Sequence, residues 1–357
     1  MDALQTLDFE MDHSCLLEGS AQVIQMAFPE WNQKDVRYVQ QTHGITNALD
    51  TTSLVDFDSY SAQKISVVKC IHNKETVLIR TYGKGTDAII DRKQEMINMI
   101  VLSRSGMSPK LYARFSNGIV YGYVEGVPFS VEDMRDSHKS LLVAGHLANW
   151  HNVDASDVMK TSPKLFGTLN QWLDVIPKRF SKPAVDASFR SFITIDRLRK
   201  EVAQLQVELT KVNAPIVFSH CDLLTGNIIF NKEKDRVDFI DYEYGSYNPR
   251  GFDIGNHFCE YAGFDCEWSL YPDESFQKVW LRRYLETANG SESSPVTEEQ
   301  VSMLYAEVNK YALAAHLYWG IWALVQAEIS DLDFDYAGYS KLRIDEYFRR
   351  KSVFLAL

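Results

Sequence analysis

The sequence lacks the patterns that assign a chain to several common protein classes. Its five cysteines are odd in number, widely scattered and without the paired CxxC spacing of a zinc site, which favours a reducing compartment. No cluster of lysine and arginine stands out among 37 basic and 48 acidic residues, and the formal net charge is −11. We therefore expect no nucleic-acid partner.

The sequence also lacks an export signal and a clear membrane span. The first 20 residues are acidic and polar, without a positive stretch followed by an apolar one, so we expect a cytoplasmic protein. Residues 311–329 approach the length that crosses a bilayer, but they include His316, Gln326 and Glu328. Ionisable groups are costly at membrane depth. We interpret this segment as a buried helix and expect no membrane-spanning one.

What is present is a chain of 357 residues, 45% of them hydrophobic, whose pattern changes near residue 125. This length suits two lobes with cores of their own. Alternating or β-branched runs before that point predict an antiparallel sheet, with strands at 36–40, 48–52, 64–70, 76–82, 111–115 and 119–124. The expected helices are 15–28, 91–102, 141–152, 188–209, 275–287, 297–327 and 341–354. We predict an α+β fold with lobes at 1–125 and 126–357.

The densest polar pattern lies in a strand-loop-strand segment, residues 216–244. It contains HCDLLTGN, of the form HxDxxxxN, and a following apolar run ends at Asp241. Singly, each of these polar residues is more often a turn or surface residue. Together they resemble the catalytic loop and the metal-binding aspartate of the eukaryotic protein kinase fold. The resemblance implies a bilobal fold of that kind, with a nucleotide-binding N-terminal lobe and a catalytic, substrate-binding C-terminal lobe.

The same resemblance implies a role for each residue of the motif. Phosphoryl transfer needs an aligned hydroxyl and positive charge over the β- and γ-phosphates, which oxygen-ligated Mg²⁺ supplies. Asp222 is expected to accept the hydrogen bond of the acceptor hydroxyl, while Asn227 and Asp241 hold the metal. Glu243, two residues along an extended segment, points to the same face as Asp241 and is a further candidate ligand. The cofactors implied are ATP and Mg²⁺.

Longer stretches narrow the resemblance. HCDLLTGNIIF, FIDYEYGSYNPRGFDIGNHFCEYAGF and HLYWGIWALVQAEISDLDFDYAGY resemble the choline/ethanolamine kinase family, more specifically in the C-terminal lobe than in the N-terminal one. Membership implies ATP-dependent phosphorylation of a small amino alcohol, the first step of the CDP-ethanolamine route to phosphatidylethanolamine. It also implies that Asp253 braces the catalytic loop, although a helix N-cap is a simpler interpretation. A homodimer is left open.

The family resemblance also assigns a nucleotide site in the N-terminal lobe. The residues implied are Gly44, Thr46, Asn47, Arg80 and Glu95. Segment 43–47 corresponds to the phosphate loop, although it has one glycine where GxGxxG has three. Arg80 stands where protein kinases carry a lysine for the phosphates, and Glu95 is placed to pair with it. Residues 121–125 are expected to contact adenine. A hairpin turn and a solvated arginine are the alternative interpretations.

The substrate residues implied by the family are largely aromatic. They are Asp222, Tyr244, Glu260, Trp319, Trp322, Tyr336 and Tyr339, with Phe334 nearby. An ammonium group over an aromatic face gains about 0.5–2 kcal/mol, whereas aromatics at helical spacing are otherwise usually core. After Glu260 the sequence has Ala262, Gly263 and Asp265, where the choline branch has further aromatics. We therefore expect ethanolamine before choline, with a choline kinase or a dual kinase as the alternative.

Other functions share parts of this pattern. A protein kinase is disfavoured because no DFG or APE sequence marks an activation loop. Aminoglycoside phosphotransferases share HxDxxxxN, but their polycationic substrates call for acidic rather than aromatic surroundings. A non-catalytic pseudokinase normally lacks a base or a metal ligand, and neither is missing here.

Overall fold

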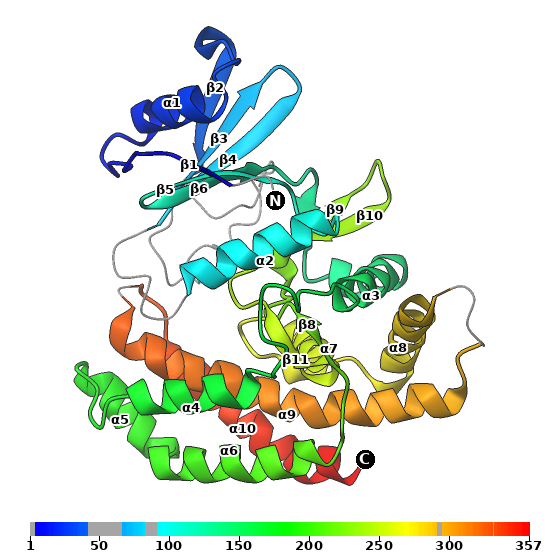
Figure 1. The fold of residues 1–357 in the computed structure, drawn as a ribbon. Coiled ribbons are helices and arrows are strands. Elements are labelled where there is room, and N and C mark those ends of the chain that lie inside the picture. The colour runs from blue at the N-terminus through cyan, green and yellow to red at the C-terminus, as the bar shows by residue number, and fades with distance from the viewer. Residues whose placement is uncertain (1–3, 42–65, 83–90, 291–294, 331) are drawn as a thin grey trace. The chain divides into compact units, whose positions relative to one another are not determined.

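The structure is a computed structural model that describes residues 4–41, 66–82, 91–290, 295–330 and 332–357. The chain forms two compact units (Figure 1). Unit 1 comprises Met1–Pro128 and Ile229–Glu243, and unit 2 comprises Phe129–Ile228 and Tyr244–Leu357. The first segment of unit 1 ends at Pro128, close to the lobe boundary that the sequence suggests at residue 125. Unit 1 also includes residues 229–243, which the sequence analysis places in the second lobe.

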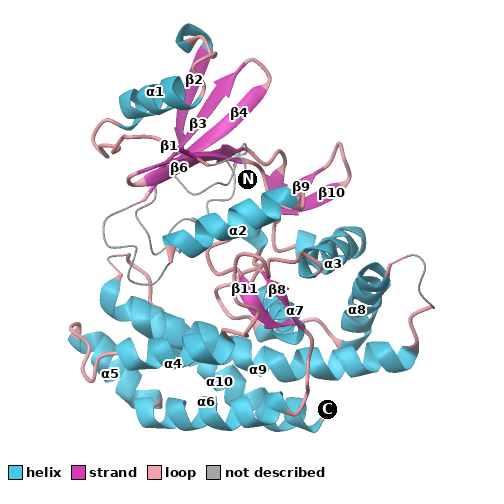
Figure 2. Ribbon diagram, in the orientation of Figure 1, coloured by secondary structure: helices cyan, strands magenta, loops and turns pink. Residues whose placement is uncertain are grey.

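A mostly antiparallel sheet dominates unit 1 (Figure 2). Among the described residues it has the order β1-β5-β6-β4-β3-β2, and only the β1–β5 pair is parallel. The strands are β1 (Gln5–Thr6), β2 (Val36–Gln41), β3 (Ser66–His72), β4 (Glu75–Thr81), β5 (Leu111–Phe115) and β6 (Gly118–Gly122). Helix α1 (Leu16–Ala27) packs on β2 and β3 and buries Val23 and Ile24 against the sheet. The predicted sheet is confirmed, while the strand predicted at 48–52 lies outside the described residues.

The rest of unit 1 explains why segment 229–243 belongs to it. Strands β7 (Val127–Pro128), β9 (Ile228–Asn231) and β10 (Arg236–Phe239) form a small sheet in the order β10-β9-β7. Helix α2 (Arg92–Arg104) is capped by Asp91, whose side chain accepts a hydrogen bond from Gln94 N. Asn98 of α2 donates through Nδ2 to the carbonyl of Tyr242 at 2.9 Å. Backbone pairing and this side-chain bond tie the segment to unit 1.

Unit 2 is mainly helical. Its helices are α3 (Ser137–His151), α4 (Leu165–Val175), α5 (Pro183–Phe192), α6 (Ile195–Thr210), α7 (Arg250–Cys259), α8 (Glu274–Asn289), α9 (Glu298–Ile329) and α10 (Tyr336–Ala356). Strands β8 (Ile216–Ser219) and β11 (Ser246–Pro249) pair antiparallel. Short 3-10 helices are η1 (Gln33–Asp35), in unit 1, and η4 (Asp133–Arg135), η5 (Thr225–Asn227), η6 (Glu260–Ala262) and η7 (Trp268–Leu270).

Helix α9 forms the centre of unit 2 and explains the long apolar run of the sequence. Helices α4, α6, α7, α8 and α10 all pack against it, so its residues 311–327 are buried throughout. This confirms the buried helix expected there. None of the helices in the described part of the chain combines the length and the apolar character needed to cross a membrane.

The helix predictions were wrong in two places. Segment 188–209 is not one helix, because the chain is extended at Ile193, with φ −154° and ψ 166°, between α5 and α6. Thr194 then caps α6 by accepting a hydrogen bond from Arg197 N. Helix α4 was not predicted. The helices expected at 141–152, 275–287, 297–327 and 341–354 correspond to α3, α8, α9 and α10.

Candidate active site

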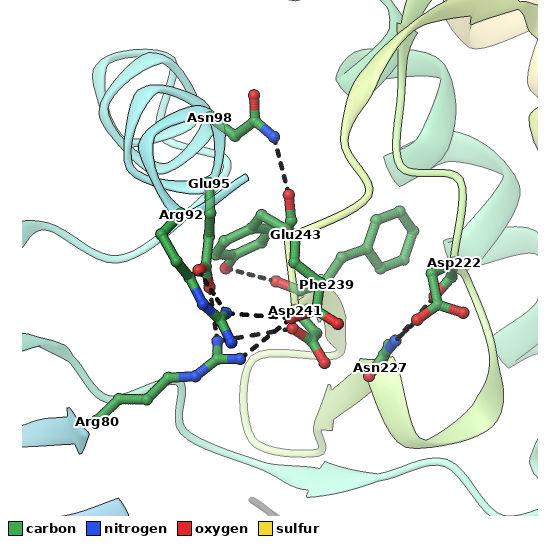
Figure 3. A network of polar contacts seen from close by, with 10 residues as sticks. Arg80, Arg92, Glu95, Asn98, Asp222, Asn227, Phe239, Asp241 and Glu243 are labelled. Carbon is green, nitrogen blue, oxygen red and sulfur yellow. Dashed lines mark hydrogen bonds and ion pairs between the residues drawn. The ribbon is translucent and has the colours of Figure 1, made fainter. Parts of the chain in front are cut away.

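The HxDxxxxN segment of unit 2 forms a loop that closes on itself. Asn227 Nδ2 donates to the carbonyl of Asp222 at 2.8 Å and to its Oδ2 at 3.2 Å (Figure 3). Both residues are 8% exposed. These bonds use the amide nitrogen of Asn227, so its amide oxygen, the atom that can bind a hard cation, is not engaged by Asp222.

Asp253 of helix α7 fixes the start of this loop. It is fully buried, and its Oδ2 and Oδ1 accept hydrogen bonds from His220 N and Cys221 N, each at 2.7 Å. His151 Nε2 lies 2.9 Å from Oδ2, and Tyr284 OH lies 2.7 Å from His151 Nδ1. Burial opposes ionisation, but the bond from His151 and the neighbouring donors outweigh it and hold the pKa of Asp253 below its usual range. The predicted brace is therefore confirmed, and the N-cap interpretation is wrong because Asp253 lies within α7.

Two further residues of α7 hold carbonyl groups of the same loop. Asn256 Nδ2 donates to the carbonyl of Cys221 at 3.1 Å, and His257 Nδ1 donates to the carbonyl of Leu223 at 2.9 Å. Neither residue was predicted from the sequence to have a role. Their partners lie more than 30 positions away in the chain, so no local pattern reports them.

The buried His257 makes stability depend on pH. Burial lowers its pKa from 6.5 to about 4, so between those values the unfolded chain binds a proton that the folded protein excludes. Stability therefore falls as the pH falls through this window. From pH 7 to pH 5, wild type should lose about 2 kcal/mol more than His257→Gln, which keeps a donor but does not titrate. Urea unfolding at both pH values measures this difference.

A matched control for this prediction is His138→Gln, which replaces an exposed histidine of α3. It should leave the wild-type pH dependence intact. An equal loss of stability in wild type and His257→Gln would contradict the prediction.

In unit 1, Arg80 of β4 lies among three carboxylates (Figure 3). Its Nη1 is 2.7 Å from Glu95 Oε1 and 3.7 Å from Asp241 Oδ1, and its Nη2 is 3.3 Å from Glu243 Oε2. Burial disfavours the charged guanidinium, but these carboxylates outweigh it and raise the pKa of Arg80 well above its usual range. The predicted Arg80–Glu95 pair is confirmed, while its role in nucleotide binding stays a prediction.

A second guanidinium in this network was missed by sequence reasoning. Arg92 Nη1 donates to Glu95 Oε2 at 3.0 Å and lies 3.5 Å from Glu243 Oε2, and its guanidinium lies 4.4 Å from the Tyr82 ring centre. Its only local signal is its position three residues before Glu95 on one helix. When all five groups are ionised, the two guanidinium groups and the three carboxylates together carry one net negative charge.

The carboxylates of unit 1 are suited to a divalent cation. Glu95, Asp241 and Glu243 each offer an oxygen within 4.8 Å of the others. Asp241 Oδ1 is buried, yet it accepts no hydrogen bond from the residues that the structure describes. Burial and the nearby Asp241 raise the pKa of Glu243 well above its usual range, despite Arg80. A hard cation such as Mg²⁺ prefers such oxygen donors, so the residues fit it.

The predicted metal and base residues are thus divided between the units. Asp241 belongs to unit 1, whereas Asp222 and Asn227 belong to unit 2. A joint site of all three stays a prediction. Gly44, Thr46 and Asn47, predicted for the phosphate loop, lie outside the described residues.

Four of the predicted substrate residues form one aromatic cluster in unit 2. Trp319 and Trp322 of α9 meet edge to face with ring centres 5.3 Å apart. Tyr244 lies 5.5 Å from Trp319, and Tyr336 lies 5.9 Å from Trp322, also edge to face. Trp322 Nε1 donates to Tyr244 OH at 3.0 Å. Two tryptophans on one helix face and two tyrosines from other segments are therefore brought together.

Two other predicted substrate residues, Glu260 and Tyr339, share an arginine that was not predicted. Arg343 of α10 is buried, and its Nη1 donates to Glu260 Oε1 at 3.2 Å and to Tyr339 OH at 3.1 Å. Burial raises the pKa of Glu260, and Arg343 opposes that shift. The positive charge of Arg343 offsets the negative charge of an ionised Glu260 and so reduces its attraction for a substrate cation. Asp265 is exposed, and its role in substrate binding stays a prediction.

Comparisons with known proteins agree with this arrangement. The model of the choline/ethanolamine kinase family matches residues 39–348. The chain is 42% identical to an ethanolamine kinase of Drosophila melanogaster over 80% of its own length, and the match spans about half (56%) of that relative. It is 35% identical to ethanolamine kinase 2 of Mus musculus, with 99% of this chain and 86% of the relative covered.

A solved structure is similar over nearly the whole chain. The ethanolamine kinase of Plasmodium vivax superposes with a TM-score of 0.77 at 25% identity, covering 96% of this chain and 91% of that one. The sheet of unit 1 and the helices of unit 2 therefore constitute a protein-kinase-like fold. The family match extends over most of the sequence, including the catalytic loop, α7 and the aromatic cluster. The chain belongs to the choline/ethanolamine kinase family.

Proposed function

We propose that this protein transfers the terminal phosphate of ATP to the hydroxyl of ethanolamine. One observation carries the proposal beyond family membership. The aromatic cluster is connected to the loop of Asp222, because Trp319 Nε1 donates to Asn256 Oδ1 at 2.6 Å and Asn256 bonds the carbonyl of Cys221. An aromatic site for a cation and a base for a hydroxyl are what an ammonium alcohol requires. The ethanolamine kinase names of the relatives support the same substrate.

The residues divide the work of phosphoryl transfer. Asp222 accepts the hydrogen bond of the substrate hydroxyl, whose oxygen forms a bond to the γ-phosphorus as the bond to ADP breaks. Asn227 and Asp241 would hold Mg²⁺, with Glu243 as a further ligand. Mg²⁺ supplies positive charge over the β- and γ-phosphate oxygens when bound. Arg80, held by Glu95, would direct its guanidinium toward the nucleotide phosphates.

Ethanolamine suits the substrate residues better than choline does. A primary ammonium has three N–H donors, whereas the trimethylammonium of choline has none. Tyr244, Tyr339 and Glu260 each accept a hydrogen bond from the protein, and their oxygens keep lone pairs for such donors. A hydrogen bond to a charged group contributes about 1.5–3 kcal/mol. We therefore expect kcat/KM to be at least about tenfold higher for ethanolamine than for choline.

A coupled ADP-release assay tests this function. Ethanolamine, its three N-methylated derivatives ending in choline, and kanamycin are compared at matched ATP and Mg²⁺, with phosphoethanolamine confirmed by mass spectrometry. We expect kcat/KM to fall with each added methyl group. The Asp222→Asn protein, purified in the same way, reports any contaminating kinase.

Each other outcome has a distinct meaning. Turnover of choline ahead of ethanolamine would overturn the substrate assignment and favour a choline kinase. Turnover of kanamycin alone would favour an aminoglycoside phosphotransferase, and no turnover of any acceptor would favour a pseudokinase.

We also propose the cytoplasm as the compartment, because the five cysteines are all free thiols and thiols stay reduced there.

A further inference from the structure

Asn256 of helix α7 uses both ends of its amide to join two parts of unit 2. Its Oδ1 accepts from the indole nitrogen of Trp319 at 2.6 Å, and its Nδ2 donates to the carbonyl of Cys221 at 3.1 Å. The side chain is fully buried. A hydrogen bond strengthens in such a setting because no water competes for the partners.

The loop end of this link acts on a strained residue. Cys221 has φ 68°, in the left-handed region, which is unfavourable for a non-glycine residue. Its N–H is held by Asp253 and its carbonyl by Asn256, so both peptide groups of Cys221 are fixed by α7. The carbonyl of Cys221 belongs to the peptide that leads into Asp222. Asn256 therefore helps to set the direction in which the Asp222 side chain leaves the backbone.

The other end of the link orients an aromatic ring. Trp319 has one polar atom, Nε1, and the 2.6 Å bond to Asn256 fixes the plane of an indole that meets Tyr244 and Trp322 edge to face. Close helix packing makes the bond feasible. A Cβ on Gly255, the residue before Asn256, would lie 2.7 Å from the carbonyl of Val308, so only glycine lets α7 approach α9 this closely.

We propose that Asn256 is a positioning residue that couples the aromatic site for the ammonium group to the backbone that carries Asp222. The inference rests on the proposed function. Asn256 does not touch substrate in this scheme; it acts through Trp319 on one side and through Cys221 on the other. Loss of either bond should lower kcat and raise the KM for ethanolamine together, while the KM for ATP stays close to wild type.

Four variants test the coupling: Asn256→Ala, Trp319→Phe, the double variant and Trp322→Phe. The first two should each lower kcat about tenfold, as expected for one buried hydrogen bond, and raise the KM for ethanolamine a few-fold. The double variant should be close to the worse single variant, because both remove the same link. Trp322→Phe is the matched control: its Nε1 bonds Tyr244 and not Asn256, so it should act mainly on KM.

A spectroscopic measurement separates this inference from the proposed function. In protein labelled with ¹⁵N at tryptophan, the Trp319→Phe variant identifies the Trp319 indole N–H resonance. Asn256→Ala should move that resonance upfield and speed its exchange with solvent, because its acceptor is gone. The other indole resonances, including that of Trp322, should stay close to their wild-type positions.

The outcomes are distinguishable. If the wild-type protein does not phosphorylate ethanolamine, the proposed function is contradicted, whatever the tryptophan indole resonances show. An active wild type in which the two single effects multiply in the double variant would overturn the coupling. If Asn256→Ala does not fold, the kinetics of Trp319→Phe test the proposal, because this variant keeps an aromatic ring. If Trp319→Phe changes only the KM for ethanolamine, as Trp322→Phe is expected to do, the proposal is overturned.

Discussion

Asp222→Asn should lower kcat for ethanolamine phosphorylation by about 10³-fold, within the range for loss of a general base. The amide keeps the size of the carboxylate, and its oxygen can still accept the bond from Asn227 Nδ2. It lacks the negative charge that aligns the substrate hydroxyl and takes up its proton. Steady-state kinetics should therefore show a large loss of kcat, with the KM for ATP within a few-fold of wild type.

The control for this experiment is Asp196→Asn, the same chemical change at an exposed position in the first turn of α6. It should keep kcat within about twofold of wild type, since exposed substitutions are usually neutral. Circular dichroism and thermal unfolding of both variants check the fold. If Asp222→Asn retains more than a third of wild-type kcat, another group must serve as the base.

Some of the interactions in the site could be predicted from the sequence. Asp222 and Asn227 share one loop, so the HxDxxxxN pattern contains both ends of their hydrogen bonds. Arg80 and Glu95 lie 15 residues apart on a strand and the following helix, and their pair was predicted. The two tryptophans of the aromatic cluster lie on one helix face. One loop brings Asp222 and Asn227 together and one helix brings the tryptophans together. The Arg80–Glu95 pair, in contrast, was implied by the resemblance to protein kinases.

Two residues that were not predicted from the sequence, Arg343 and Asn256, have distant partners. Arg343 meets Glu260 across 83 residues, and Asn256 meets Trp319 across 63 residues. Nothing local marks them, because an arginine or asparagine in a helix is usually exposed. The brace formed by Asp253 was expected only through family resemblance, not through its spacing. These contacts depend on helix packing in unit 2, which a period of 3.6 residues does not specify.

The break between α5 and α6 shows a similar limit for the fold. The strand and helix periods predicted most elements within a few residues of their observed bounds. At residues 193–194, however, two amphipathic helices follow each other without a glycine or proline between them. The spacing of apolar residues is therefore helical on both sides of the break, and a single helix was predicted. The extended Ile193 and the capping hydroxyl of Thr194 end one helix and begin the next. A single threonine is too common to predict such a boundary.

Asp241→Asn should raise the Mg²⁺ concentration needed for half-maximal activity by at least about tenfold and lower kcat about 10²–10³-fold. Asp241 has φ 67°, and asparagine tolerates this left-handed conformation about as well as aspartate, so the backbone should be kept. The change removes one carboxylate from the set with Glu95 and Glu243. The Arg80 guanidinium, 3.7 Å from Asp241 Oδ1, then has one negative neighbour fewer.

Metal binding can be measured without turnover. Titration of Mn²⁺ into protein with ADP, followed by electron paramagnetic resonance of the free ion, should show weaker binding in Asp241→Asn than in wild type. Asp238→Asn is the matched control, since Asp238 precedes Asp241 by three residues and pairs with Arg236 at 3.0 Å. It should bind Mn²⁺ like wild type. Equal Mn²⁺ affinity and equal Mg²⁺ dependence in Asp241→Asn and wild type would remove Asp241 from the metal site and leave Glu243 as the better candidate, because both residues lie in the same acidic cluster.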